Sequence, residues 1–435
     1  MALNKKPYKG CRDFFPKGMR VRNYLFHHMC DVAEKFGFEA YDGPLLEEVD
    51  LYKAKSGEEL INDQIYSFTD RGDRNVAIRP EMTPTVARMV ANIHKQETKP
   101  IRWYSIPNLM RYEKPQRGRV REHWQFNVDI FGAPENLGEL EVVSLVIQFL
   151  KSFGAKSDMF AILLNDRTLV DAVFNDILNL EAESALKLYK VIDKAKKVSP
   201  GKLDIMIREI LLTEEQFIIF KEYLALNSIE SLTKFATQNN IAQKSESFIQ
   251  FLTMCQELEL SEFIEYDPTI VRGLDYYTGV VFEIFDKHPD NNRAIAGGGA
   301  YANLLKIFNE EPLGGIGFGL GDVTLRDFLE THKLLPDLSK ASHDVFVVNV
   351  EDEHNLYNMT ISNQLRELGI KVESHLGKIK FNKIFKLAQS KGHSKILIIE
   401  DQGDGIELEL KDLTTNKNTK IDINKINQIK DYIKG

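Results

Sequence analysis

Hydrophobic and polar residues alternate strictly from His123 to Ile130. Because strand side chains point alternately to opposite faces, this pattern predicts a strand with one face in a core. The other face then carries an imidazole, two amides and a carboxylate in one row, from His123, Gln125, Asn127 and Asp129. A solvated surface strand would show the same alternation, so the row by itself predicts a strand and leaves its role open.

Other periodic segments in the first part of the chain predict a mixture of helices and strands. Apolar residues at helical spacing predict helices over 19–36, 83–91 and 139–153. Alternating or β-branched runs predict strands over 38–41, 101–113, 122–131 and 159–164, and a hairpin of strands 64–70 and 75–79.

The character of the chain changes between about residues 167 and 260. Glycine nearly disappears there, and Leu, Ile, Lys and Glu follow helical spacing, so we expect an inserted helical subdomain with a solvated charged face. Strand patterns return over 266–285. The glycine-rich segment 295–305 is interpreted as a turn that leads into a helix, and 314–329 as a strand followed by a helix.

A polar linker with a proline, 331–343, precedes a second pattern in which strands and helices alternate. Such alternation predicts a compact α/β domain. The expected organisation is therefore a first domain over 1–330 with its helical insertion, a linker, and a second domain over 344–435. Within the second domain we expect strands over 345–350, 370–374, 395–400 and 406–410, and helices over 354–368, 381–391 and 424–433.

Composition narrows the class of protein. With 435 residues, 43% hydrophobic and 28% charged, the chain is typical of a globular protein of two or three domains. No apolar run approaches the roughly 20 residues that a membrane helix needs. Three scattered cysteines and no paired zinc-ligand spacing argue for a reducing cytoplasm and against a metal site held by the protein. The net charge of −8 confines any nucleic-acid contact to local basic patches.

One such basic patch directly precedes the alternating strand. Between Arg111 and Arg121 five residues are basic and one, Glu113, is acidic. Pro115 and Gly118 predict a turn in the middle. Guanidinium groups on a loop, beside a row of polar side chains on a rigid strand, suit a polyphosphate held next to a small polar substrate.

The strand–loop–strand RYEKPQRGRVREHWQF closely resembles motif 2 of the class II aminoacyl-tRNA synthetases, in the form found in histidyl-tRNA synthetases. Other resemblances follow in the family's order. The helix–strand–proline unit at 19–44 is similar to motif 1, and RPEMT at 79–83 to the family's RPE-x-T segment. VRGLDYY at 271–277 matches the histidine signature, 314–329 is similar to motif 3, and the last domain resembles an anticodon-binding domain.

The resemblance implies an α/β and α+β multidomain enzyme with an antiparallel catalytic sheet. It would be a cytoplasmic histidine–tRNA ligase that forms histidyl-adenylate and charges tRNA(His), as a homodimer built through motif 1. ATP would be a substrate, with Mg²⁺ neutralising its β- and γ-phosphates. Arg111 and Arg272 would bind the α-phosphate, and either Gln125 or a phosphate oxygen would assist the transfer step.

The implied binding residues form two sets. Those for histidine are Glu81, Thr83, Arg111, Gln125, Asp129, Arg272, Tyr276, Tyr277 and Tyr301. Those for ATP are Arg111, Glu113, Arg119, Arg121 and His123. Structural interpretations of the same residues stay open. Thr83 also fits a helix N-cap, Asp129 the end of a strand, and Tyr277 a core position.

Two segments depart from the family pattern. Ala300, Ala302 and Asn303 stand where the second histidine motif has Arg, Asp and Gly. Thr324 stands where motif 3 has its ATP-binding arginine, and Arg326, two positions on, would point about 200° away on a helix. The sequence therefore leaves open how the adenine and γ-phosphate are bound.

Two alternatives fit parts of the chain. A non-catalytic, histidine-binding paralogue that regulates a partner enzyme would explain the altered motifs, but such paralogues lack an anticodon domain and degrade the VRGLDYY signature. A class II ligase for threonine, proline or glycine would share motif 2 and lack that signature. The expectation is therefore a histidine–tRNA ligase.

Overall fold

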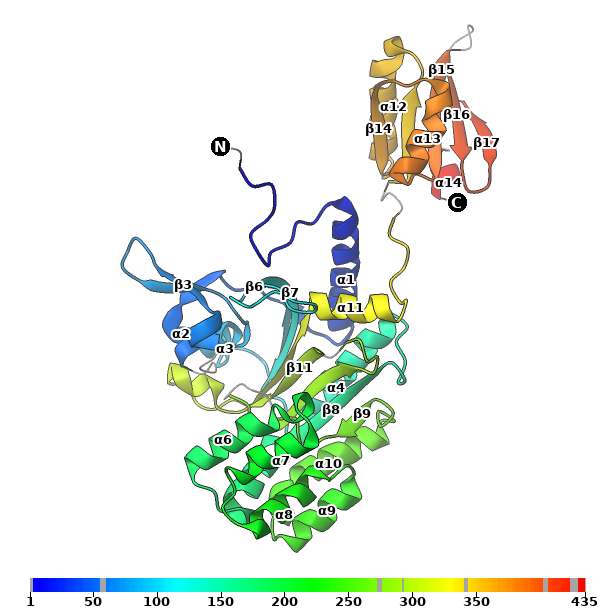
Figure 1. Ribbon diagram of the computed structural model, residues 1–435. Coiled ribbons are helices and arrows are strands. Elements are labelled where there is room, and N and C mark those ends of the chain that lie inside the picture. The colour runs from blue at the N-terminus through cyan, green and yellow to red at the C-terminus, as the bar shows by residue number, and fades with distance from the viewer. Residues whose placement is uncertain are drawn as a thin grey trace. The chain divides into compact units, whose positions relative to one another are not determined.

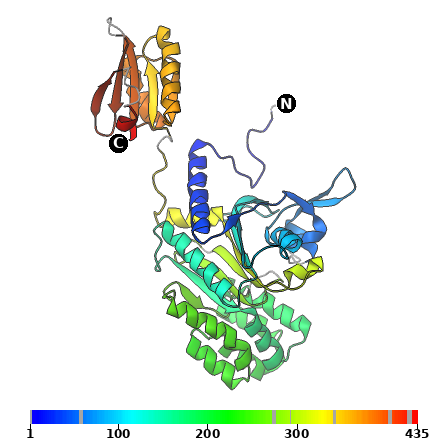
Figure 2. The ribbon, with the colours of Figure 1, turned by 180° about the vertical axis from the view of Figure 1, so that it is seen from behind.

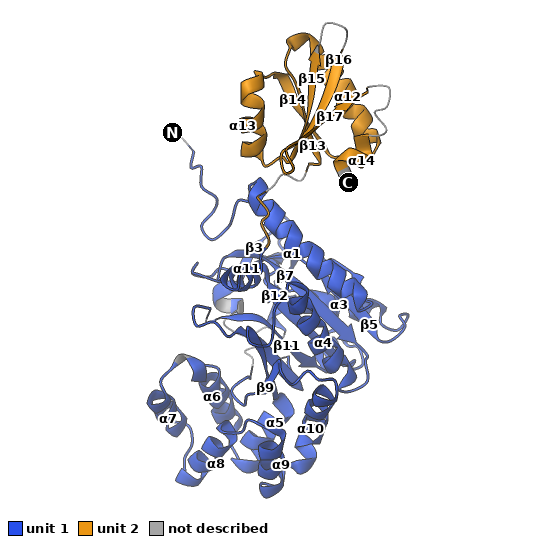
Figure 3. Ribbon diagram, turned by 90° about the vertical axis from the view of Figure 1, so that its right-hand side faces the viewer, with its two compact units in different colours: residues 1–335 blue, residues 336–435 orange. Residues whose placement is uncertain are grey.

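The computed structural model describes residues 3–54, 60–271, 276–291, 293–339, 343–401, 406–422 and 429–434. The chain divides into two compact units, Met1–Leu335 and Pro336–Gly435 (Figure 3). This division falls inside the linker predicted over 331–343. Among the described residues, no helix has the length and apolar character needed to span a membrane.

The first unit is built on a large, mainly antiparallel sheet (Figure 1). Its described strands follow the order β1-β5-β7-β12-β11-β10-β8-β9, with β6 paired to β7. The pairs β1–β5 and β8–β9 at the two ends are parallel. The predicted antiparallel sheet is thus confirmed. The strands are β1 Glu39–Ala40, β5 Ile101–Ser105, β6 Asn108–Met110, β7 Glu122–Phe131, β8 Phe160–Asp166, β9 Ile264–Tyr266, β10 Val280–Asp286, β11 Ala294–Tyr301 and β12 Gly315–Gly321.

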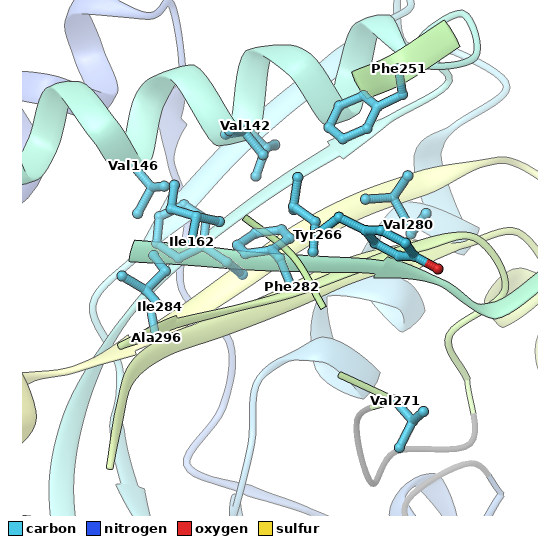
Figure 4. Close-up of a cluster of buried hydrophobic side chains, with 14 of the residues drawn as sticks. Val142, Val146, Ile162, Phe251, Tyr266, Val271, Val280, Phe282, Ile284 and Ala296 are labelled. Atoms are coloured by element: carbon cyan, nitrogen blue, oxygen red, sulfur yellow. The ribbon is translucent and has the colours of Figure 1, made fainter. Parts of the chain in front are cut away.

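The apolar residues of β7 face a core under helix α4 (Leu137–Ser152). Phe126, Val128 and Ile130 are fully buried there, as the alternation predicted. Figure 4 shows the neighbouring part of this core, where Val142 and Val146 of α4 lie over the sheet. Helix α1 (Pro16–Lys35) packs against α4. The polar row of β7 therefore lies on the opposite face of the sheet.

On that opposite face a second hydrophobic cluster anchors helix α3 (Thr83–Ile93). Val86 and Val90 of this helix pack with Phe131 and Tyr301 of the sheet. Next to it lies a small sheet in the order β2-β4-β3, in which the predicted hairpin of β3 and β4 is confirmed. Its elements are β2 Leu46–Glu48, helix α2 Val49–Lys53, β3 Tyr66–Thr69 and β4 Asn75–Ile78.

Helices follow one another from β8 to β9 and form the lower part of the unit in Figure 2. They occupy the range in which the sequence predicts a helical insertion. Their packing is dominated by aromatic and aliphatic residues such as Phe220, Phe248 and Phe251, which are buried. The helices are α5 Arg167–Ala172, α6 Ala182–Ile192, α7 Pro200–Arg208, α8 Glu214–Leu224, α9 Ile229–Gln238 and α10 Ala242–Glu257.

Two local predictions are wrong. The segment 295–305 is not a turn into a helix, because Ala294–Tyr301 forms β11 in the middle of the sheet, followed by a short 3-10 helix at Leu304–Phe308. Nor does Thr83 cap α3. The helix begins at Thr83, its N-cap residue is Met82, and no side chain caps it. By contrast, β12 runs into helix α11 (Asp322–Thr331) as predicted.

The second unit is an α/β domain, as predicted. Its sheet has the order β14-β13-β15-β16-β17. Strand β17 is an addition to the predicted set, because its sequence, Lys417–Ile421, is polar and short. The elements are β13 Val345–Asn349, α12 Asn355–Glu367, β14 Val372–Lys378, α13 Phe381–Lys391, β15 Lys395–Asp401, β16 Ile406–Asp412, β17 Lys417–Ile421 and α14 Ile429–Lys434.

Candidate active site

A patch of bare backbone lies on the face of the sheet opposite α4. It is formed by Gly297 and Gly299 of β11, which pair with Gly319 and Gly317 of β12. We call these four residues the glycine floor. Gly317 also pairs with Asp129 of β7 on its other side. The polar row predicted from sequence thus borders a floor that carries no side chains.

Three of the four floor glycines lie directly under side chains that leave no room for a Cβ. A Cβ on Gly317 would overlap the Asp129 carboxylate, and one on Gly319 would lie 2.6 Å from Cδ of Gln125. A Cβ on Gly299 would lie 2.7 Å from the Tyr277 ring. Such distances are well inside van der Waals contact, so no residue with a Cβ fits without displacing these groups.

A small cavity stands over the floor between β7, β11 and α3. We call it the inner cavity. Its lining includes many of the residues predicted to bind histidine: Glu81, Thr83, Arg111, Gln125, Tyr276, Tyr277 and Tyr301. Glu81 is 4% exposed, and the Tyr276 hydroxyl donates to its Oε2 at 3.3 Å. A buried carboxylate held in this way can pair with an ammonium group.

Asp129 lies below the inner cavity, behind Tyr301. The Tyr301 hydroxyl donates a hydrogen bond to Oδ1 of Asp129. Burial raises the pKa of Asp129 to about 7, and the hydrogen bond from Tyr301 opposes that rise. Burial, followed by the charge of Asp129, raises the pKa of Tyr301 far above its usual range, so its hydroxyl keeps its proton. Asp129 therefore acts on the cavity through Tyr301.

A second, larger cavity of about 790 Å³ adjoins the first, and we call it the outer cavity. Arg111 and Gln125 border both cavities, so they mark the place where the two meet. The outer cavity is lined on one side by the loop between β6 and β7, and on the other by β10, β11 and α11. Its charged and ionisable lining residues are Arg111, Glu113, Arg119, His123, Glu283 and Arg293.

Hydrogen bonds hold the loop between β6 and β7 in place. Arg111 donates from Nε to the Pro80 carbonyl oxygen at 2.8 Å, which ties the loop to the segment before α3. Arg119 forms an ion pair with Glu113 across the loop. These contacts present the first and last parts of the loop to the outer cavity.

Arg121 differs from the other predicted ATP-binding residues. Its Nη1 donates to the Tyr8 hydroxyl at 3.0 Å, and its guanidinium lies 4.0 Å from the centre of the Tyr112 ring. It is buried and is not part of the lining of either cavity. In this arrangement Arg121 supports the loop from behind.

His123 lies on the cavity wall next to Arg111. Burial and the positive charge of Arg111 lower the pKa of His123 to about 3, so its imidazole is neutral at pH 7. A neutral ring can donate or accept a hydrogen bond without adding to the positive charge of the loop.

Sequence reasoning missed three further features of the site. Glu283 of β10 and Arg293, just before β11, both line the outer cavity. Asp322, at the start of α11, accepts hydrogen bonds from the Trp124 N–H at 3.0 Å and from Arg12 at 2.9 Å, which ties α11 to β7. A lone acid or arginine carries no periodic pattern, so these residues gave no sequence signal. Arg272 lies outside the described residues.

A mainly antiparallel sheet with two adjoining cavities on one face, bordered by an arginine-bearing strand–loop–strand, defines a class II aminoacyl-tRNA synthetase. Comparison with known proteins narrows this class. The family model for histidyl-tRNA synthetase matches residues 10–323, and the model for an anticodon binding domain matches residues 344–431.

Relatives match over nearly the whole chain. The histidine–tRNA ligase of Leptospira biflexa is 43% identical over 421 residues, covering 95% of this chain and 94% of the relative. That of Opitutus terrae is 38% identical over 423 residues, with the same coverage. The chain belongs to the histidyl-tRNA synthetase family. The predicted function, a histidine–tRNA ligase, is confirmed, and no finding favours a regulatory paralogue.

Solved structures show the same fold. The histidyl-tRNA synthetase from Nostoc sp. PCC 7120 has a TM-score of 0.83 at 21% identity, and covers 99% of this chain and 100% of its own. The apo histidyl-tRNA synthetase of S. aureus has a TM-score of 0.72 at 23% identity, and covers 100% of both chains. At these identities the likeness concerns the fold alone.

Proposed function

We propose that the inner cavity binds L-histidine and the outer cavity binds ATP, so that the two substrates meet at Arg111 and Gln125. The observation that carries this proposal is that these two residues border both cavities. The enzyme activates L-histidine with ATP and transfers the histidyl group to tRNA(His), with release of AMP and diphosphate. A junction between the cavities is where the histidine carboxylate must approach the α-phosphate.

In the first step a carboxylate oxygen of histidine attacks the α-phosphorus, and the bond from that phosphorus to the leaving pyrophosphate breaks. The carboxylate is already ionised at pH 7, so no general base is needed. Catalysis then depends on positioning and on fixed positive charge at the phosphates. Arg111 supplies such charge from β6–β7, and Arg272 is assigned the same role from the sequence signature.

The walls of the inner cavity match the polar groups of histidine. Glu81, which lines the cavity beside Thr83 and Tyr276, would bind the α-ammonium group. The aromatic rings of Tyr277 and Tyr301 border the space left for the imidazole. The imidazole carries an N–H donor in each of its protonation states. The hydroxyl oxygen of Tyr301 could accept a hydrogen bond from it, because the hydroxyl hydrogen of Tyr301 is already donated to Asp129.

Asp129→Asn tests this assignment of the imidazole pocket. At pH 8, where Asp129 is ionised, the substitution should weaken histidine binding by about 1–3 kcal/mol, because the charge behind Tyr301 is lost. Isothermal titration with histidine measures this loss, and ATP binding serves as the control that should hardly change. Unaltered histidine affinity in the folded variant would remove Asp129 from the pocket.

The same variant has a pH signature. Between about pH 4 and pH 7 the folded protein holds a proton on Asp129 that the unfolded chain has released, so this residue makes the free energy of unfolding fall as pH rises. The difference in unfolding free energy between wild type and Asp129→Asn should therefore change across this range and level off above it. Denaturant titrations at several pH values measure it.

ATP would be bound in the outer cavity by Arg119 and Glu113 of the loop and by the neutral ring of His123. We propose that Mg²⁺ accompanies the nucleotide and neutralises its β- and γ-phosphates. Glu113 and Glu283 both line this cavity, and carboxylate oxygens are the ligands that Mg²⁺ prefers, so the residues present fit the ion. Activity that persisted in excess chelator would contradict a need for Mg²⁺.

The second step transfers the histidyl group to the 3′ end of the tRNA. Gln125 lies at the junction of the cavities, where its amide can assist by hydrogen-bonding the attacking 3′-terminal hydroxyl; the alternative group is a phosphate oxygen of the adenylate, which would assist by accepting the proton of that hydroxyl. Gln125→Leu distinguishes these two alternatives. If the phosphate oxygen accepts the proton, single-turnover transfer of the histidyl group from preformed adenylate should continue in this variant; if Gln125 is needed, the transfer should be lost.

The second compact unit is proposed to bind the tRNA anticodon, and the first to hold all residues needed for adenylate formation. Truncation after Leu335 is therefore expected to leave histidine-dependent ATP–pyrophosphate exchange largely intact and to cripple tRNA charging. Leu334 and Leu335 pack against the core of the first unit, so the cut should fall after them. Equal loss of both activities in a folded, dimeric truncation would contradict this division.

A homodimer in the cytoplasm completes the proposal. Exposed apolar side chains of the segments that follow the motif 1 strand, Leu45, Leu46 and Phe68, are 50%, 43% and 49% exposed. A second copy of the chain would cover such side chains. Sedimentation equilibrium at micromolar concentration measures the mass, and a monomer there would refute the dimer.

A further inference from the structure

Position 324 carries no charge where the family pattern has its ATP-binding arginine. The Thr324 hydroxyl hydrogen-bonds to the backbone: it lies 3.1 Å from the Ile295 carbonyl oxygen and 3.2 Å from that of Gly321. Arg326 does not take over, because it is 44% exposed and forms an ion pair with Glu330 along α11. The outer cavity therefore lacks an arginine from α11.

The guanidinium of Arg293 lies near Thr324 but comes from the segment before β11 instead of from α11. Arg293 immediately precedes β11, two residues before Ile295, to which Thr324 is bonded. A Cβ on Gly118, in the loop between β6 and β7, would lie 3.0 Å from Cδ of Arg293 and 3.7 Å from Cγ2 of Thr324. Arg293 and Thr324 thus border one point of the cavity wall, opposite the tip of the loop.

The end of β10 and Asn291, which precede Arg293, are hydrogen-bonded to this loop and to each other. Arg117 donates to Oδ1 of Asn291 at 3.1 Å, and Asn291 in turn donates to Asp286 at 2.6 Å. Asp286, at the end of β10, also bonds His332 at 2.7 Å, just beyond α11. These bonds hold Asn291 and the end of β10 between the loop and α11, on the same side of the outer cavity as Arg293.

The arginines of the loop between β6 and β7 have partners, whereas Arg293 has none among the described residues. Arg117 bonds Asn291, Arg119 pairs with Glu113, and Arg121 bonds Tyr8. Among the residues that the structure describes, Arg293 makes no hydrogen bond and no ion pair, although it lines the outer cavity. The carboxylates of Asp290 and Asp327 border the adjoining space without pairing with it. A guanidinium in this state has all its donors available for an anion.

We propose that Arg293 binds the β- and γ-phosphates of ATP, and the leaving pyrophosphate, in place of the arginine that position 324 lacks. This inference rests on the proposed ATP site. When the bond between the α-phosphorus and the bridging oxygen breaks, its electron pair passes to pyrophosphate, and Arg293 stabilises the added charge. We expect this place to bind phosphates rather than the adenine ring. Arg293 lies opposite Arg117 and Arg119 of the loop, and a polyanion bound between these three positive charges would reduce the repulsion between them.

Arg293→Gln tests the role in the full-length enzyme. The substitution should raise the KM for ATP, and the KM for pyrophosphate in the reverse reaction, by about 10- to 100-fold through loss of a charged hydrogen-bonding group. The KM for histidine should stay within about twofold. Arg293→Lys should recover part of the loss, since a lysine keeps the charge. Arg326→Gln is the matched control on the surface of α11 and should leave all three constants unchanged.

Moving the arginine back provides a second test. In Arg293→Gln/Thr324→Arg the guanidinium would enter the same point of the cavity from α11, so the KM for ATP and for pyrophosphate should return toward the wild-type values. A double variant no better than Arg293→Gln would show that the two positions are not equivalent and overturn the replacement.

Arg111→Ala separates failure of this inference from failure of the ATP site. If Arg111→Ala disables adenylate formation while Arg293→Gln leaves the constants for ATP and pyrophosphate unchanged, the site stands and Arg293 has no part in it. If neither substitution has an effect, the outer cavity is not the ATP site, and both proposals fall.

Discussion

Replacement of Arg111 by alanine is expected to reduce histidine-dependent ATP–pyrophosphate exchange by about 100- to 1000-fold, the effect of removing one fixed group that stabilises charge in a transition state. The arginine borders both cavities, and its Nε is fixed by the Pro80 carbonyl oxygen. Its charge therefore needs no rearrangement when negative charge develops on the α-phosphate. The main loss should appear in kcat, measured by exchange at saturating histidine and ATP.

The control for this variant addresses its structural role. Because Arg111 also holds Pro80, next to Glu81, its loss could disturb the ammonium site and raise the KM for histidine. Arg111→Lys keeps the positive charge but lacks the planar set of N–H donors of a guanidinium. Compared with Arg111→Ala, it should therefore restore the stability of the fold more fully than it restores kcat. Arg74→Ala, at an exposed ion pair with Asp70, should be silent. An Arg111→Ala enzyme with normal kcat would place the α-phosphate elsewhere.

Gly317→Ala is expected to destroy histidine activation. A Cβ at this position would overlap Oδ1 of Asp129 and approach the Val128 carbonyl oxygen to 2.6 Å. The backbone oxygen belongs to the neighbouring strand and cannot rotate away, so the sheet itself must shift. Overpacking of this kind costs about 1–3 kcal/mol of stability. Because the shift displaces Asp129 and Tyr301, the loss of histidine binding should exceed what the melting temperature alone suggests.

Gly314→Ala is the matched control, since a Cβ there would meet no atom within 4 Å. It should melt like the wild type and bind histidine normally. Thermal melting together with histidine titration distinguishes the two positions. If Gly317→Ala bound histidine as tightly as Gly314→Ala, then Asp129 and the floor beneath it would not shape the pocket.

The polar row of the site could be predicted from sequence because it follows a physical period. In β7 the apolar positions are buried under α4, so Gln125 and Asp129 must lie on the other face. The floor beside them was misread for an equally physical reason. A run of glycines in 295–305 is typical of a turn, and only the pairing of β11 with β10 and β12 shows why a strand needs them.

Residues that act across distant segments escaped prediction. Arg293 is adjacent to Gly118 only because β11 and β7 lie on either side of β12. The local sequence around either residue does not predict this contact. Asp129 and Tyr301 were both assigned to the histidine site from sequence, but their contact was not. The structure shows it as a hydrogen bond from the Tyr301 hydroxyl to the Asp129 carboxylate. The order of strands in the sheet decides such partnerships.

The glycine floor also limits how such an enzyme could be recoded for another amino acid. At Gly317 and Gly299 even a methyl group would come within 3 Å of a backbone oxygen as well as a side chain, so mutations there damage the pocket before they can reshape it. Changes of substrate must therefore come from the walls, at positions such as Tyr277 and Tyr301, where a side chain can be exchanged for another of different length. A directed-evolution library confined to those wall positions would sample new specificities while keeping the backbone surface on which any amino acid has to lie.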